Sequence, residues 1–82
     1  HAWANEKGII IQELLSRENH SISRMQLNRK FYLHANDKEW DEIMVSLAAA
    51  GIVLIEQKGA MIIYIMPPNM VLELGKHFAG KQ

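Results

Sequence analysis

The sequence predicts a small, mainly helical α+β domain with a three-helix core, a short β-hairpin and an extra C-terminal helix. Apolar residues recur at helical spacing in segments that begin with capping residues. A glycine ends the third of these segments just before two short apolar runs, and two prolines follow the second run. With 82 residues, 49% of them hydrophobic, the chain has room for one core, so we expect a single domain over residues 1–82.

The first helix is expected from Trp3 or Asn5 to about Glu18. Four apolar residues at helical spacing form its inner face: Ile10, Ile11, Leu14 and Leu15. Asn19-His20 ends this helix, and residues 21–23 bridge to the next one.

The second helix has its own start signal, because Ser23 and Gln26 are spaced as a capping box. Leu27 and Phe31 lie four residues apart and should both face the core. We expect this helix to be short and to end near residues 32–35.

The third helix begins at Asn36, a good N-cap residue, and Glu39 can complete a second capping box. Its apolar stripe consists of Trp40, Ile43, Met44 and Leu47. Gly51 should end it in the left-handed conformation, with Ile52 placed for a Schellman contact with Leu47.

Two apolar runs, 52–55 and 61–66, are separated by a polar segment with Lys58-Gly59 and predict a β-hairpin. The second run does not alternate between apolar and polar residues, so both of its faces need cover. The last helix, a second copy of the chain, or the rest of a longer protein could supply that cover.

Pro67-Pro68 stops the second strand because neither proline can donate to a ladder. Asn69 is expected to cap a last helix that ends before Gly80. Three residues define its apolar face: Val71, Leu74 and Phe78.

The order of these elements over residues 5–66 resembles the winged helix-turn-helix superfamily. The segment from Trp40-Asp41-Glu42-Ile43 through Leu47 to Ala50-Gly51-Ile52-Val53 is similar to the ending of the third helix in many winged helices. The resemblance implies that the hairpin is a wing of two to three strands, with Ile22 as the inward residue of a very short strand. It reports fold more than function.

A looser likeness is to the accessory winged-helix domains of phage- and plasmid-type primase–helicase replication proteins. Those domains have a similar segment before the third helix, here Gln26-Leu27-Asn28-Arg29-Lys30-Phe31. This likeness implies an accessory, nucleic-acid-binding domain of a DNA replication or mobile-element protein.

Charge is distributed unevenly, although nine basic and nine acidic residues cancel. The third helix is acidic in its first turns, which disfavours an ordinary major-groove reader. The second helix is basic, so it and the wing are the expected phosphate-binding surface for single- or double-stranded DNA with weak sequence preference. The candidate residues are Arg24, Asn28, Arg29, Lys30, Lys38 and Lys58. Alternatively, this basic face is only solvated and pairs with acids of the next helix.

The other hypothesis is a protein-interaction or dimerisation domain that does not bind DNA. Val45 and Ala49 lie on the outer side of the third helix, where small uncharged residues suit close packing. Ile63 and Ile65 belong to the overly apolar strand. A second copy of the chain or other domains of a longer protein are the expected partners.

Catalytic and metal chemistry find little support in the sequence. There is no cysteine, the four histidines have no metal-ligand spacing, and no glycine-rich phosphate loop or nucleophile motif is present. We therefore expect no enzymatic activity, no cofactor and no metal.

No apolar run approaches the roughly 20 residues of a membrane span, and no signal peptide is visible, so we expect a cytoplasmic protein without membrane contact. The chain begins at His1 without an initiator methionine, which suggests a piece of a longer protein or a tag remnant.

Overall fold

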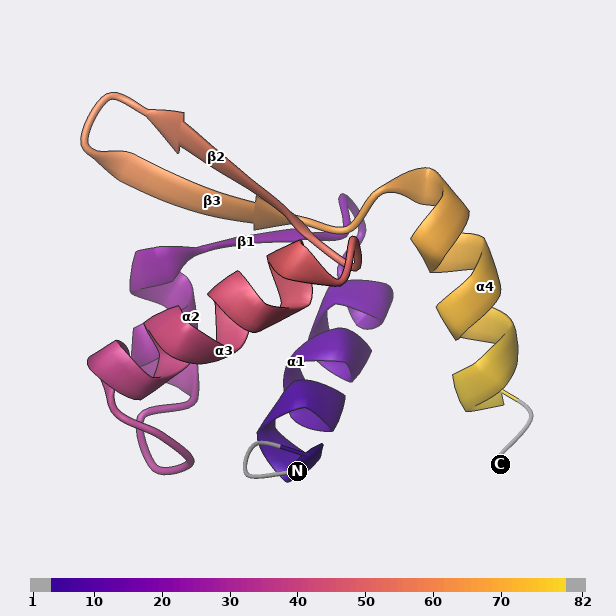
Figure 1. Cartoon of the computed structure of the whole chain (residues 1–82), viewed down its shortest axis with the longest axis horizontal. Coiled ribbons are helices and arrows are strands. Elements are labelled where there is room, and N and C mark those ends of the chain that lie inside the picture. The colour runs from indigo at the N-terminus through magenta and orange to yellow at the C-terminus, as the bar shows by residue number, and fades with distance from the viewer. Residues whose placement is uncertain (1–3, 80–82) are drawn as a thin grey trace.

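A computed structural model describes residues 4–79 of the chain (Figure 1). This part is a small α+β domain with four helices and a three-stranded antiparallel sheet, a layout consistent with that of a winged helix. In chain order the elements are α1 (Ala4–Ser16), β1 (Ser21–Ser23), α2 (Arg24–Lys30), α3 (Asp37–Ala49), β2 (Leu54–Lys58), β3 (Met61–Ile65) and α4 (Pro68–Ala79).

Both predicted capping boxes are confirmed. The Ser23 side chain accepts a hydrogen bond from the backbone N–H of Gln26, and the Asn36 side chain accepts one from the backbone N–H of Glu39. In each box the backbone N–H of the capping residue donates in return to the side-chain oxygen three residues on. Since these bonds satisfy orphan amides of the first turn, the starts of α2 and α3 are determined locally.

The end of α3 is also as predicted. Gly51 adopts a φ of 79°, and the Ile52 amide donates to the Leu47 carbonyl at 2.9 Å. The Gly51 amide donates to the Ala48 carbonyl at 3.0 Å, which completes the Schellman pattern.

Two helices are shorter than predicted. The first ends at Ser16 instead of near Glu18, and His20 takes a positive φ of 52° before the chain enters β1. The second ends at Lys30, because Phe31 leaves the helical conformation with a φ of −119° and a ψ of 29°. Trp3, offered as a possible helix start, lies outside the described residues.

The first hairpin strand lies further along the chain than predicted. It runs over Leu54–Lys58 rather than residues 52–55, and Lys58 pairs with Met61. The turn is therefore only Gly59-Ala60, with Gly59 at a φ of 62°. Val53, just before β2, is buried in the core, and the pairing with β3 begins only at Leu54, which pairs with Ile65.

The sheet has the order β1-β3-β2, so the short strand around Ile22 is present as the resemblance implies. Ile22 and Ile55 both pair with Tyr64, which places the three side chains on one face. Ile22 and Tyr64 are buried against the helices. The alternate residues lie on the opposite face, which we call the outer sheet face. Its apolar residues are Leu54, Met61, Ile63 and Ile65, and the charged residues Glu56 and Lys58, which pair with Ile63 and Met61, lie on it as well.

The predicted cap of the last helix is wrong. The Pro67 carbonyl accepts hydrogen bonds from the Met70 and Val71 amides, both at 3.0 Å, and Pro68 is the first helical residue. Proline suits this position because its φ is already helical and it has no amide to leave unpaired. Asn69 therefore lies inside the first turn. The predicted roles of the Phe78 side chain and of Gly80 fall outside the part of the chain described.

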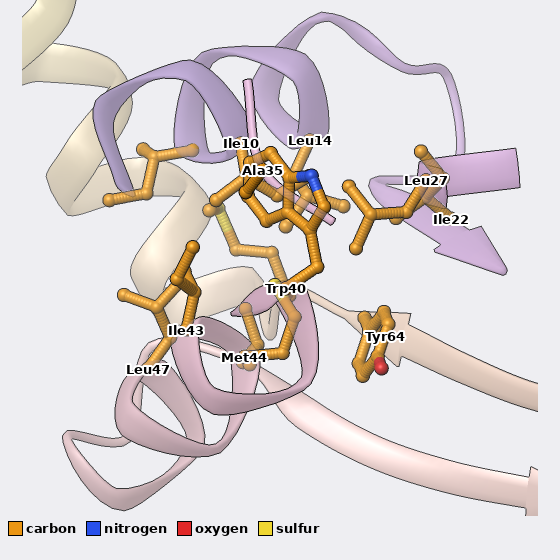
Figure 2. Packing of buried hydrophobic residues seen from close by; sticks show 13 residues of the cluster. Ile10, Leu14, Ile22, Leu27, Ala35, Trp40, Ile43, Met44, Leu47 and Tyr64 are labelled. Carbon is orange, nitrogen blue, oxygen red and sulfur yellow. The ribbon is translucent and has the colours of Figure 1, made fainter. Parts of the chain in front are cut away.

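The core lies between α1, α2, α3 and the inner face of the sheet (Figure 2). Trp40 is its largest buried side chain, and the indole N–H donates to the Phe31 carbonyl at 3.0 Å. Leu15 and Phe31, also predicted to face inward, are only partly buried and pack against the core. The other residues that the sequence placed on the inner faces of the first three helices are buried: Ile10, Ile11, Leu14, Leu27, Trp40, Ile43, Met44 and Leu47.

The last helix does not fold over the hairpin. α4 packs against α1, and Figure 1 shows the hairpin tip at the opposite end of the molecule. Met70, Val71 and Leu74 contact the core from this side. The outer sheet face is thus not covered by α4 along the length of the hairpin.

Candidate nucleic-acid interface

A groove of about 790 Å³ separates α2 from the tip of the hairpin. We call it the α2–hairpin groove and define it by its lining residues: Arg24, Met25, Asn28, Arg29, Tyr32, Ala60, Met61 and Ile62. These eight described residues include two arginines, an asparagine and a tyrosine but no acidic residue.

Helical geometry explains which α2 residues reach the groove. At about 100° per residue, Arg24 and Asn28 lie about 40° apart around the helix axis and Arg29 lies about 140° from Arg24, so the three fall within one half of the helix circumference. Leu27 lies on another side and is fully buried in the core. The opposite wall is formed by β3 and the turn before it.

Arg24 is held by an acid of the neighbouring helix. Its Nε donates to Asp41 Oδ1 at 2.7 Å and its Nη2 donates to Asp41 Oδ2 at 2.8 Å. The hydrogen bonds that Arg24 donates to Asp41, together with the negative charge of Asp41, raise the pKa of the Arg24 guanidinium further above its ordinary value. This bidentate pair joins α2 to α3 and reduces the charge that Arg24 offers to a phosphate.

Arg29 and Tyr32 are the exposed polar residues of the groove. Arg29 is exposed to solvent, and Tyr32 is 68% exposed just beyond the end of α2. Two methionines beside them, Met25 at 64% and Met61 at 54% exposure, give the groove apolar walls.

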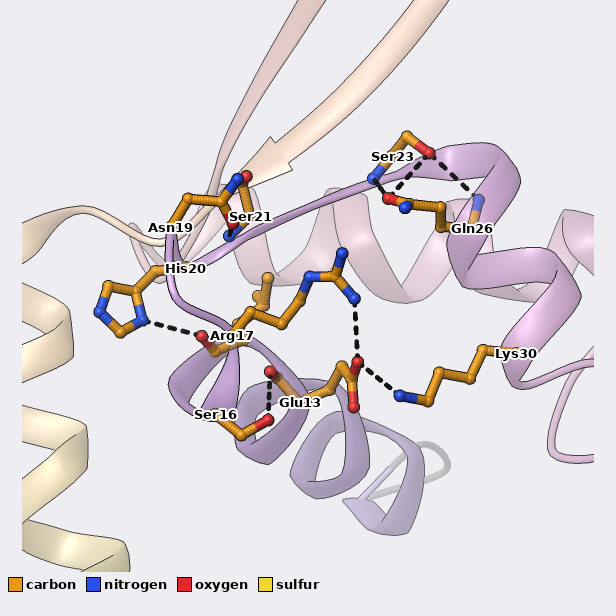
Figure 3. Close-up of polar contacts among 10 residues, drawn as sticks. Glu13, Ser16, Arg17, Asn19, His20, Ser21, Ser23, Gln26 and Lys30 are labelled. Carbon is orange, nitrogen blue, oxygen red and sulfur yellow. Dashed lines mark hydrogen bonds and ion pairs between the residues drawn. The ribbon is translucent and has the colours of Figure 1, made fainter.

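Lys30 lies away from the groove. Its Nζ donates to Glu13 Oε2 at 2.9 Å, and Arg17 Nη1 donates to the same oxygen at 3.2 Å (Figure 3). Partial burial by itself would raise the pKa of Glu13, but the hydrogen bonds from Lys30 and Arg17 outweigh it and hold the pKa below its ordinary value. Lys30 thus joins α2 to α1, and its charge is partly neutralised.

The remaining two predicted cations are exposed. Lys58 is the last residue of β2, next to the turn whose Ala60 lines the groove. Lys38 lies in the first turn of α3, between Asp37 and Glu39. The structure therefore brings Arg24, Asn28 and Arg29 together in the groove lining, places Lys58 beside the hairpin turn but outside that lining, and directs Lys30 to Glu13.

The residues predicted for protein contact lie on two different surfaces. Val45 and Ala49 are exposed on α3. Ile63 and Ile65 belong to the outer sheet face and are partly exposed. Ile65 also lines a smaller apolar cavity of about 490 Å³ with His20, Val71 and Leu72.

Five lining residues were not among the predicted site residues: Met25, Tyr32, Ala60, Met61 and Ile62. The first two could have been found, because they share the helical spacing of Arg24, Asn28 and Arg29. Met61 had no such signal, since its place depends on the strand register.

Within residues 4–79, no helix combines the length and hydrophobicity needed to cross a bilayer. No group of three His, Asp or Glu side chains among the described residues is arranged to hold a metal ion. In comparisons with protein-family models, with curated proteins and with solved structures, the chain has no significant match.

Proposed function

We propose that this chain is an accessory winged-helix domain of a DNA replication or mobile-element protein that binds nucleic acid through α2 and the hairpin. The observation that carries the proposal is the α2–hairpin groove, whose lining has two arginines and no acid. A phosphate backbone is attracted by such a surface without regard to base sequence.

The acidic third helix supports this choice of surface over a recognition helix in the major groove. Glu39 is used in the capping box, Asp41 binds Arg24, and Glu42 is exposed. Acids at exposed positions repel phosphate, so the proposed contact avoids this helix.

Fluorescence anisotropy with short labelled DNA, at about 50 and 200 mM salt, tests the proposal. The test variant is Arg29→Ala with Lys58→Ala, which removes the two exposed cations of the surface. The matched control is Lys30→Ala, which removes one cation that lies against Glu13 instead. Circular dichroism should show that all variants are folded.

We expect the wild type to bind at low salt and to weaken as salt rises. The double variant should bind less tightly, and its affinity should depend less on salt, by a log–log slope of about 0.7–0.9 per lost phosphate contact. Lys30→Ala should bind nearly as the wild type does. Absence of binding at about 50 mM salt, or equal binding by the double variant, contradicts the proposal.

The outer sheet face favours a second candidate function, protein interaction without DNA binding. Leu54 and Met61 are more than half exposed there, and with Ile63 and Ile65 they form the apolar part of a face that also carries Glu56 and Lys58. A second copy of the chain is the first partner to test. Light scattering coupled to size exclusion would show a dimer that Ile63→Lys dissociates, and a monomer at all concentrations would count against it.

A further inference from the structure

We propose that the α2–hairpin groove takes a single strand of nucleic acid, with a base stacked on Tyr32 and a phosphate bound by Arg29. This inference rests on the proposed function and adds the form of the ligand and the residue that selects it. It follows from the mixture of groups that the groove brings together.

Tyr32 is an aromatic side chain that the core does not use. The described aromatic contacts of the core join Phe31 to Trp40 and to His34, whereas Tyr32 is 68% exposed. An exposed ring beside arginines is a typical stacking platform, because each nucleobase has a flat face that fits it.

The walls beside Tyr32 are apolar and the cations are few. Met25, Met61 and Ile62 would contact a flat apolar group, and Arg29 would contact an anionic one. A duplex offers phosphates and base edges, but its base faces are hidden in the stack. A single strand offers base faces and phosphates together, so it matches both parts of the lining.

Charge complementarity favours a single strand of nucleic acid over an apolar peptide as the ligand of the groove. The eight described lining residues include no acid, and although Asp41 offsets much of the charge of Arg24, Arg29 is exposed and offers its charge to the groove. Asp41 itself is not one of the lining residues. A polyanionic strand with exposed bases is therefore favoured.

The test measures the fluorescence anisotropy of three labelled probes of equal length as the protein is added, at about 50 mM salt. The probes are a single strand of mixed sequence, the corresponding duplex, and an abasic single strand. The variants are Tyr32→Ala, Tyr32→Phe and Arg29→Ala. Because Tyr32 is largely exposed, its replacement should leave the fold intact, as thermal unfolding would verify.

We expect the single strand to bind more tightly than the duplex. Tyr32→Ala should weaken single-strand binding roughly ten-fold and should leave the abasic strand unaffected. Tyr32→Phe keeps the ring and should keep the affinity. Arg29→Ala should weaken binding of all three probes.

The outcomes separate the two proposals. If the duplex binds as tightly as the single strand, or if Tyr32→Ala binds like the wild type while Arg29→Ala is weaker, single-strand stacking is wrong and phosphate binding stands. If no probe binds, both proposals are wrong, and a peptide ligand becomes the occupant to test.

Discussion

Asp41→Asn should have opposite effects on stability and on nucleic-acid binding. In the folded chain, Asp41 accepts two hydrogen bonds from Arg24, at 2.7 and 2.8 Å. The asparagine has nearly the same shape but no charge, and it can accept at only one of its two terminal atoms. The substitution therefore weakens the pair and releases the guanidinium toward the groove.

The loss of stability should be small. The two side chains are 36% and 42% exposed, so solvent screens their attraction. For an exposed pair, even a bidentate one, we expect a decrease of about 0.5–1 kcal/mol in the free energy of unfolding. For a domain of this size that corresponds to a Tm roughly 2–8 °C lower.

The gain in nucleic-acid affinity should be that of about one additional phosphate contact. One further contact on a single strand adds about 0.7 to the log–log salt slope, so a four-fold rise in salt should cost Asp41→Asn about 2.6-fold more affinity than the wild type. At low salt the variant should therefore bind several-fold more tightly.

The assay combines thermal unfolding with anisotropy at about 50 and 200 mM salt. Glu42→Gln is the matched control, since it removes one negative charge from an exposed neighbour on α3. If both variants gain affinity equally, only the net charge matters and release of Arg24 is refuted. If Asp41→Asn binds more weakly than the wild type, Arg24 needs Asp41 to hold it in place.

Three further predictions concern stability. Gly51→Ala should lower the free energy of unfolding by about 1 kcal/mol because Gly51 has a φ of 79°, whereas Gly8→Ala inside α1 should raise it by about 0.5–1 kcal/mol. An added Cβ meets no atom within 4 Å at either site, so the backbone conformation decides both effects. If urea unfolding shows that both substitutions change the free energy of unfolding in the same direction, this reasoning is wrong. Trp40→Phe should lower the free energy of unfolding by roughly 1–3 kcal/mol, because side-chain volume and the hydrogen bond to the Phe31 carbonyl are both lost. A decrease below about 0.5 kcal/mol in the same assay would show that the core repacks. The pKa of Glu13 lies below its ordinary value of 4.5 in the folded chain, so ionised Glu13 stabilises the fold at pH values above 4.5. This stabilisation is lost as the pH falls through the pKa of the folded state. The difference in Tm between the wild type and Glu13→Gln should therefore be present at neutral pH and vanish in acid.

The candidate site was predictable only in part. Helical spacing is enough to group Arg24, Asn28 and Arg29 within one half of the helix circumference, and they do share the groove. Lys30 is one residue further, about 100° around the helix, and it meets Glu13 on α1 instead. Both ion pairs of α2 join residues 17 positions apart, so neither pairing is visible in local sequence.

The sequence by itself determined where α2 and α3 begin and where α3 ends. Capping boxes and the Schellman turn join residues at most five apart, so the residues at Ser23, Asn36 and Gly51 suffice to specify them. Apolar spacing likewise identified the buried side of each core helix.

Tertiary structure alone decided the strand register, the position of α4 and the form of the groove. Register depends on which residues of separate strands meet, and the pairing of β2 with β3 begins at Leu54 rather than at residue 52. The side on which α4 packs depends on the surface that α1 leaves open. These features arise from contacts between distant segments, and such contacts depend on the relative placement of whole elements rather than on any local pattern.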